Sequence, residues 1–241
     1  MTSDRCVIFD LDGILVDSEV YWRAGFRETI DVLAEEAGLT PPGLTDEVLV
    51  QYEGGRVPDT IGALVRDHLP SLWPLDDERL LDAVHVAVGT ASRRITEVPR
   101  TLDDSVRAAS DLDAAGYTLA VASSSARQFI DAALDSVGLS KLVAIRESAF
   151  DVEHAKPHPE VYLKAMAALG TDPQHCVAVE DSETGVRAAL AAGLSTIWRT
   201  TSPRTLDGVR PLSGDGPRSP GTKPWLISVT EVSSDSIESA F

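Results

Sequence analysis

The second half of the chain alternates short apolar segments with helical segments, and this alternation restricts the fold more than any other feature. The expected strands cover residues 117–122, 142–145, 176–179 and 195–198. Apolar residues recur at helical spacing over residues 102–115, 127–137, 159–169 and 184–192, and a glycine follows each of these helices. Strands that alternate with helices of this length predict βαβ units and a parallel sheet. Short apolar strands are typical of a sheet that is covered on both faces.

The first half of the chain contains one expected strand and then only helices. The strand covers residues 6–10, and the helical segments that follow cover 19–37, 48–52, 60–68 and 76–95. We therefore predict an α/β fold with a doubly wound parallel sheet. Residues 1–16 and 98–241 are expected to form this Rossmann-like core, with an inserted all-helical cap over residues 17–97.

The C-terminal region differs in composition from the rest of the chain. Residues 200–224 are rich in Pro, Gly and Ser, which predicts a long loop. Residues 225–229 form a possible last strand, and the tail after it either frays or docks as a final helix.

Charge and cysteine content exclude several classes of function. The formal net charge of −17 disfavours non-specific binding to nucleic acid or to an anionic membrane. No apolar run is long enough to span a membrane, and the N-terminus lacks the layout of a signal peptide, so a cytoplasmic location is expected. Cys6 and Cys176 lack the CxxC spacing of a metal site, and we expect two buried, reduced thiols.

Polar residues stand where the expected strands end. The first strand runs into Asp10-Leu11-Asp12-Gly13, the second into Ser123-Ser124-Ser125, and the fourth into Glu180-Asp181-Ser182. Lys156 lies in the loop after the third strand. Because ligands of a doubly wound sheet bind beyond the carboxyl ends of its strands, these four segments predict a single site.

Several carboxylates with one cation predict a particular chemistry. Carboxylates repel one another unless a partner balances them, and Mg²⁺ is a hard cation that takes oxygen ligands and keeps phosphate in its shell. Lys156 and the serine hydroxyls suit the remaining phosphate oxygens. One carboxylate can attack phosphorus, and a second can give a proton to the leaving group and then activate water. The sequence therefore predicts phosphoryl transfer through an aspartyl phosphate, with Mg²⁺ as cofactor.

Four motifs carry a resemblance to the haloacid dehalogenase-like hydrolase superfamily. They are FDLDGILVDS, the serine that ends VAS, the lysine of AKP, and EDS. With the helical insert, the chain resembles the β-phosphoglucomutase-like and phosphoglycolate-phosphatase-like group of that superfamily. Two departures are Ala155, where relatives commonly have Gly, and the absence of the usual Pro-Gly where the chain returns from cap to core.

The resemblance implies a role for each motif residue. Asp10 is the nucleophile and Asp12 the general acid and base, while Ser123 and Lys156 bind the transferring phosphoryl group. The implied ligands of Mg²⁺ are Asp10, the main-chain carbonyl of Asp12, Asp181 and, directly or through water, Glu180. We also expect a cis peptide bond between Lys156 and Pro157, because cis bonds are largely confined to X–Pro.

The residues expected to contact substrate leave alternatives open. Ser124 and Ser125 either contact phosphate through their backbone N–H groups or cap a helix. Trp22 belongs either to the core or to the substrate-facing surface of the cap. Arg56 stands where related caps present substrate loops, or it is an ordinary surface arginine. His154 and His158 flank Lys156 and are expected to be exposed loop histidines.

Three functions compete for this chain. The first is a Mg²⁺-dependent phosphohydrolase of a small phosphorylated metabolite, such as a sugar phosphate, in a monomer or small homo-oligomer. The second is a β-phosphoglucomutase-type phosphomutase, and the third, less favoured, is a non-catalytic binding protein. Counted from Asp10, Trp22 stands where β-phosphoglucomutases place a histidine, and tryptophan cannot accept a proton. The phosphatase is therefore preferred.

Overall fold

One parallel sheet forms the centre of the structure. The computed structural model describes residues 5–53, 55–200, 226–229 and 231–241. Within these residues, six parallel strands form a sheet in the order β3-β2-β1-β4-β5-β6. The strands are β1 Cys6–Phe9, β2 Thr118–Ser123, β3 Val143–Ser148, β4 Cys176–Glu180, β5 Ser195–Arg199 and β6 Leu226–Val229. The predicted α/β fold with a doubly wound parallel sheet is confirmed.

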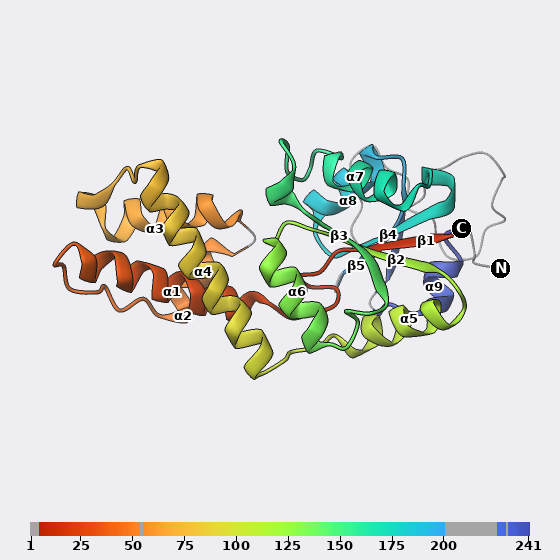
Figure 1. Cartoon of the computed structure of the whole chain (residues 1–241), viewed down its shortest axis with the longest axis horizontal. Helices are drawn as coiled ribbons and strands as arrows, with labels where there is room; N and C mark the ends of the chain where they lie inside the picture. Colours follow the sequence, from red (N-terminus) through yellow and green to blue (C-terminus); the bar gives the residue numbers. More distant parts are fainter. Residues whose placement is uncertain (1–4, 54, 201–225, 230) are drawn as a thin grey trace.

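Helices cover both faces of the sheet, as the apolar strands predicted. They are α5 Asp103–Ala114, α6 Arg127–Ser136, α7 Glu160–Leu169, α8 Glu183–Ala191 and α9 Ser234–Glu238. In Figure 1, α7 and α8 lie above the sheet, and α5 and α6 lie below it. Side chains alternate between the two faces along β1: Val7 and Phe9 pack in the apolar cluster that includes α5 and α6, and Ile8 packs in the cluster with α7 and α8.

The strand order places the switch of direction next to β1. The chain adds β2 and β3 on one side of β1 and then returns to place β4 on the other side. Phe9 of β1 pairs with Val121 of β2 and with Val179 of β4. The residues that follow these three positions, including Asp10 and Glu180, therefore emerge side by side at the crevice where such sheets bind ligands.

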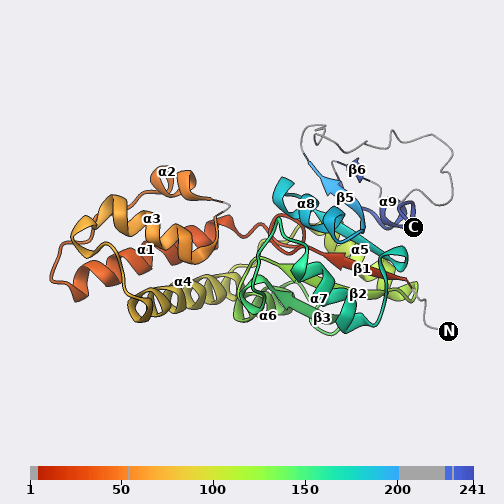
Figure 2. The ribbon, with the colours of Figure 1, turned by 90° about the horizontal axis from the view of Figure 1, so that it is seen from above.

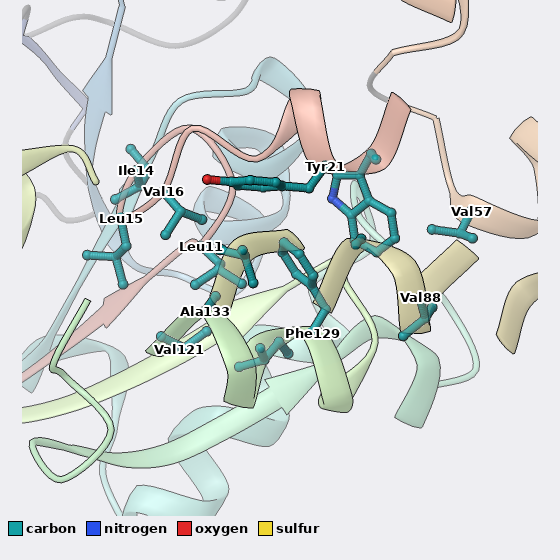
Figure 3. Packing of buried hydrophobic residues seen from close by; sticks show 14 of the residues in the cluster. Leu11, Ile14, Leu15, Val16, Tyr21, Val57, Val88, Val121, Phe129 and Ala133 are labelled. Atoms are coloured by element: carbon teal, nitrogen blue, oxygen red, sulfur yellow. The ribbon is translucent and has the colours of Figure 1, made fainter. Parts of the chain in front are cut away.

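Four helices lie beyond the end of the sheet where the strands finish (Figures 1 and 2). They are α1 Glu19–Glu36, α2 Asp46–Leu49, α3 Val57–His68 and α4 Asp77–Glu97, and we call them the helical cap. The cap and the core share one apolar cluster. In Figure 3, Phe129 of α6 lies between Leu11 of the core and Val88 of the cap, and all three belong to this cluster. The division of the chain at residues 17 and 97 stays a prediction.

Two segments connect the cap to the core, and they run side by side. Val16 forms an isolated antiparallel bridge with Thr101. The N–H of Asp17 donates to the Arg100 carbonyl at 2.9 Å, and Arg100 Nε lies 3.0 Å from Asp17 Oδ2. The second connection, which the sequence located poorly, is therefore adjacent to the first.

Several local expectations are refined by the structure. Strand β3 runs three residues beyond its expected end at residue 145, because its polar side chains are paired: Arg146 Nη1 donates to Asp131 Oδ1 at 2.6 Å. The tail docks as α9, with Ile237 buried. The peptide bond between Lys156 and Pro157 is cis, as predicted. The expected loop at residues 200–224 falls, apart from Thr200, outside the described residues.

Both cysteines are buried and neither forms a disulfide, as expected. Cys6 and Cys176 are neighbours across β1 and β4. The contact with Cys6 and burial both raise the pKa of the Cys176 thiol. None of the described helices has both the length and the apolar character needed to cross a membrane.

A close approach of α1 to α4 gives a test of the cap packing. A Cβ at Gly25 would lie 2.5 Å from the Ala87 carbonyl oxygen, so we expect Gly25→Ala to lower the free energy of unfolding by about 1–3 kcal/mol. Gly89 of α4 is the matched control, since its nearest atom would be Arg93 Nη1 at 3.9 Å. Gly89→Ala should be neutral or stabilise the protein by up to about 1 kcal/mol. Urea unfolding followed by circular dichroism measures both, and equal effects would contradict the packing argument.

Candidate active site

A buried ammonium group ties together the ends of three strands. Lys156 Nζ donates to Asp10 Oδ1 at 2.8 Å, to the Ala122 carbonyl at 2.9 Å and to Glu180 Oε1 at 2.6 Å. The three charged side chains are at most 9% exposed. Burial alone would lower the pKa of Lys156, but the Asp10 and Glu180 carboxylates hold it above its usual value, so the group is cationic. The structure thus brings Asp10, Lys156 and Glu180 together, as the sequence predicted.

Glu180 is held by donors on both carboxylate oxygens. Besides Lys156, the Tyr162 hydroxyl donates to Oε1 at 2.5 Å and Ser182 Oγ donates to Oε2 at 3.3 Å. A Cβ at Gly185 would lie 2.0 Å from this carboxylate, so only glycine leaves room for it. Tyr162 was not predicted at the site, because its only sequence signal is an apolar position on a helix.

Three carboxylates converge beside this lysine. Oxygen atoms of Asp10, Glu180 and Asp181 all lie within 4.8 Å of one another. Burial, together with the charges of Glu180 and Asp12, raises the pKa of Asp181 to about 7. Burial also raises the pKa of Asp10 well above its usual value, which Lys156 only partly offsets. One cation does not balance this set.

The donor set fits a divalent hard cation. All three groups supply oxygen, which is the ligand type that Mg²⁺ prefers, and the single ammonium of Lys156 faces three carboxyl groups. Gly13 lies directly against Asp181: a Cβ at Gly13 would be 1.8 Å from Asp181 Oδ2, and its φ of +75° also favours glycine. The predicted contact of the Asp12 main-chain carbonyl with the metal stays a prediction.

Asp12 accepts hydrogen bonds from both the core and the cap. Its Oδ2 accepts from Ser123 Oγ at 3.2 Å and from Ser125 Oγ at 2.7 Å. Its Oδ1 accepts from Trp22 Nε1 at 3.2 Å and from Ser18 Oγ. Ser18 stands at the N-cap of α1 but makes no side-chain cap bond, because its hydroxyl is directed to Asp12. Ser18 was not singled out from the sequence, where it is typical of caps and turns. Ser125 was expected to cap a helix or to contact phosphate through its backbone N–H, but the N-cap of α6 is Ala126 and the Ser125 hydroxyl donates to Asp12.

A cavity of about 340 Å³ lies between cap and core. Its residues include Asp10, Asp12, Ser124, Lys156 and Asp181 from the core, and Glu19, Trp22, Phe26, Glu53, Arg56 and Val57 from the segments of the cap. The strand-end residues predicted for one site, apart from the buried Ser123 and Glu180, thus line one cavity. Ser123 reaches that cavity indirectly, through its hydrogen bond to Asp12.

The three substrate-contact predictions have different outcomes. Ser124 is exposed to the cavity, and it does not cap α6, whose N-cap is Ala126. Trp22 belongs to both alternatives: its ring centroid lies 4.6 Å from that of Phe129, and the residue also lines the cavity. Arg56 lines the cavity rim with an exposed side chain. The substrate roles of all three stay predictions.

Glu19 is a cavity residue that the sequence did not indicate. It lies in the first turn of α1, where an acidic residue ordinarily signals only a favourable helix start. Its carboxylate forms no hydrogen bond or ion pair with the described residues. Burial, followed by the charges of Glu53 and Asp12, raises the pKa of Glu19 to about 7.

Comparisons with known proteins found one family profile, similar sequences and similar folds. The sequence profile described as haloacid dehalogenase-like hydrolase matches residues 5–193. Hexitol phosphatase B of Escherichia coli (strain K12) is 31% identical over 194 residues, which cover 79% of this chain and 81% of that protein. The crystal structure of CbbY from Rhodobacter sphaeroides in complex with phosphate superimposes with a TM-score of 0.68 at 23% identity, covering 84% of this chain and 88% of that one. β-Phosphoglucomutase from Clostridium difficile gives a TM-score of 0.65 at 20% identity, covering 82% and 84%. At these identities the two structures show a shared fold.

The raised carboxyl pKa values predict how stability depends on pH. In the folded protein, Asp181, with its pKa raised to about 7, retains a proton that the unfolded chain, with an ordinary pKa near 3.8, has already released. Ionisation therefore favours the unfolded chain as pH rises from about 4, so without divalent metal the melting temperature should fall between about pH 4 and about pH 7 and then level off. Mg²⁺ should raise the melting temperature at the higher pH, because it balances the ionised carboxylates.

Thermal unfolding followed by circular dichroism, with and without Mg²⁺, measures this dependence. Asp181→Asn is the matched variant, because it keeps the shape and removes the titrating group. It should flatten the fall in melting temperature and weaken the effect of Mg²⁺. A metal-free protein that becomes more stable across this pH range would contradict the argument.

Proposed function

Since the chain belongs to the haloacid dehalogenase-like hydrolase family, we propose that it is a Mg²⁺-dependent phosphatase that works through a phosphoenzyme on Asp10. Family membership and the identity to a named phosphatase already make it a phosphatase of small phosphorylated compounds. The proposal adds the cofactor, the covalent intermediate and the residue roles.

The observation that carries the proposal is the arrangement around Asp10. Lys156 contacts Oδ1, and among the described residues no donor contacts the other carboxylate oxygen, Oδ2. Asp10 also lines the cavity. A substrate phosphoryl group entering the cavity would meet this unengaged oxygen, with Lys156 beside it to hold phosphate oxygens.

The reaction follows in two steps. In the first, an Asp10 oxygen forms a bond to phosphorus while the bond from phosphorus to the leaving oxygen breaks, and Asp12 gives that oxygen a proton. In the second, water attacks phosphorus and gives a proton to Asp12, and the bond to Asp10 breaks to release phosphate. When bound, Mg²⁺ would neutralise charge on the phosphoryl oxygens, with Asp10 and Asp181 as its side-chain ligands. Glu180 would not contact the ion directly, because its oxygens already accept hydrogen bonds from Lys156, Tyr162 and Ser182.

Asp12 is positioned to couple proton transfer to the cap. Two of its four donors, Ser18 and Trp22, belong to the start of α1, and the other two lie at the end of β2 and just after it. A movement of the cap would therefore change the hydrogen bonding of the proton-transfer group. We propose that closure over substrate releases Asp12 from some of these donors so that it can protonate the leaving group.

The cap side of the cavity favours an uncharged, hydroxyl-bearing leaving group. Trp22 and Phe26 provide apolar surface, while Glu19 and Glu53 provide carboxylates. Glu53 is paired with Arg23, whereas Glu19 has no partner of this kind among the described residues and can accept from a substrate hydroxyl. When ionised, Glu19 would also repel a second phosphate on the substrate. We therefore propose sugar or polyol monophosphates as the substrate class.

The same residues argue against a phosphomutase. A mutase turns a bisphosphate intermediate over in its cavity and has to hold the distal phosphate. The cap presents Trp22, Glu19 and Glu53 there, and its cation Arg56 lies 4.0 Å from Asp59 and is exposed. The expectation of a monomer or small homo-oligomer stays a prediction.

Replacing the proposed nucleophile tests the mechanism. Asp10→Asn should reduce phosphate release by at least about three orders of magnitude, because an amide does not form the phosphoenzyme. Asp172→Asn is the matched control. Asp172 pairs with His175 and does not line the cavity, so its replacement should leave turnover within a few-fold of the parent. Release of phosphate from a panel of sugar and polyol monophosphates, with Mg²⁺ or with EDTA, measures both. A folded Asp10→Asn protein with near-parental turnover, or full activity in EDTA, would overturn the proposal.

A second assay separates the phosphatase from the mutase. The protein is incubated with β-glucose 1-phosphate, a trace of the 1,6-bisphosphate and Mg²⁺. We expect free phosphate to exceed glucose 6-phosphate, because among the described cap residues that line the cavity the only cation is the exposed Arg56, which also lies near Asp59. Efficient formation of glucose 6-phosphate with little free phosphate would favour the mutase instead.

A further inference from the structure

A second group of metal-ligating side chains lies on the loop that carries Lys156. His154 and His158 stand two residues to either side of that lysine, and Glu160 begins α7. The two imidazole rings face each other with centroids 4.6 Å apart. Each of the three residues offers a ligand atom, and these atoms all lie within 4.8 Å of one another. None of the three lines the cavity between cap and core.

The distances match those around a tetrahedral ion. His154 Nδ1 lies 3.1 Å from Glu160 Oε2, and His158 Nδ1 lies 3.7 Å from the same oxygen. Bonds of about 2.0–2.1 Å to nitrogen and oxygen give ligand-to-ligand distances of about 3.3 Å in a tetrahedral zinc site. The observed values lie on either side of this distance, so small side-chain rotations would bring all three atoms to one ion.

The carboxylate of this group is already oriented by the main chain. The N–H of Glu153 donates to Glu160 Oε1 at 2.9 Å, and the N–H of His154 donates to Oε2 at 3.0 Å. These bonds fix the position of the carboxylate before any ion arrives. The histidine side chains remain about half exposed, at 56% and 48%, so an ion from solvent can reach them.

We propose that His154, His158 and Glu160 bind a divalent transition-metal ion of the Zn²⁺ class, with solvent in the fourth position. Two imidazoles and one carboxylate suit Zn²⁺, Co²⁺ or Ni²⁺. The proposed catalytic group of Asp10, Glu180 and Asp181 offers only oxygen and suits Mg²⁺. The chain would thus hold two ions of different chemistry, separated by ligand type.

The position of this site gives the ion a defined structural effect. His154 and His158 enclose the segment from which Lys156 enters the active site. An ion bonded to both histidines and to the first residue of α7 would tie the two ends of that segment together. The ion should therefore raise the melting temperature of the protein, because it binds the folded loop and not the unfolded chain.

Co²⁺ binding, measured without any assay of turnover, tests the proposal. Metal-free protein is titrated with Co²⁺ in the presence of excess Mg²⁺, and the visible absorption of four-coordinate Co²⁺ is recorded; Zn²⁺ is then added as a competitor. We expect one Co²⁺ per chain, displaced by Zn²⁺. His154→Ala and His158→Ala should each weaken the Co²⁺ affinity at least about tenfold. Losing a residue that only hydrogen-bonds to a metal ligand already weakens binding by about 10–100-fold, and losing a ligand should cost no less.

His175→Ala is the matched control. His175 makes the same kind of contact with a carboxylate, Nδ1 to Asp172 Oδ1 at 3.0 Å, and it too is about half exposed. Among the described residues, however, it belongs to no group of three ligands. Its replacement should leave the Co²⁺ affinity and the Zn²⁺-induced rise in melting temperature unchanged.

Three results would overturn the proposal. One is the absence of stoichiometric Co²⁺ binding. Another is binding that both loop-histidine variants retain in full. The third is binding that Asp181→Asn abolishes while the histidine variants keep it, because the ion would then occupy the carboxylate group beside Asp10. Failure here leaves the proposed phosphatase function untouched, since that function is tested by turnover in Mg²⁺.

Discussion

The buried ammonium of Lys156 is the interaction on which the rest of the active site depends. Asp10 and Glu180 leave neighbouring strands with little exposure to solvent, and two such carboxylates repel each other unless a cation lies between them. Lys156 supplies that cation and also donates to the Ala122 carbonyl at the end of β2. Removing one partner of such a buried group leaves uncompensated charge, which is strongly destabilising. The lysine therefore holds three strand ends in register as well as facing the cavity.

The charge that Lys156 leaves unbalanced is what gives the site its chemistry. With Asp181 added, the carboxylates outnumber the cation, and burial and mutual repulsion raise the pKa values of Asp10 and Asp181. A site in this state is less stable as it ionises, and a divalent ion relieves that instability. The same electrostatic imbalance thus links folding stability, metal binding and the proposed reactivity of Asp10.

Asp12 connects this core to the cap. It lies two residues beyond the nucleophile position and shares its carboxylate between donors at the start of α1 and donors at or just after the end of β2. Trp22 adds an apolar contact to Phe129 of α6, so the hydrogen bond and the packing both link cap to core. The two chain segments that connect cap and core pair with each other at Val16 and Thr101, so they would rotate together when the cap moves. This arrangement gives the proposed closure a single hinge region.

The sequence by itself determined the fold class, most strands and helices, and the polar residues that end the strands, because these depend on local periodicity and on residues next to one another in the chain. Asp10, Lys156 and Asp181 could be assigned to one site because parallel strands end at one edge. Only the tertiary structure decided the partners of these groups. Tyr162 donating to Glu180 and Ser125 donating to Asp12 join residues far apart in the chain, and neither has a local signal that differs from a core or cap residue. The docking of α9 and the length of β3 likewise depend on contacts across the fold, since burial and ion pairing with distant segments override the polar character of those stretches.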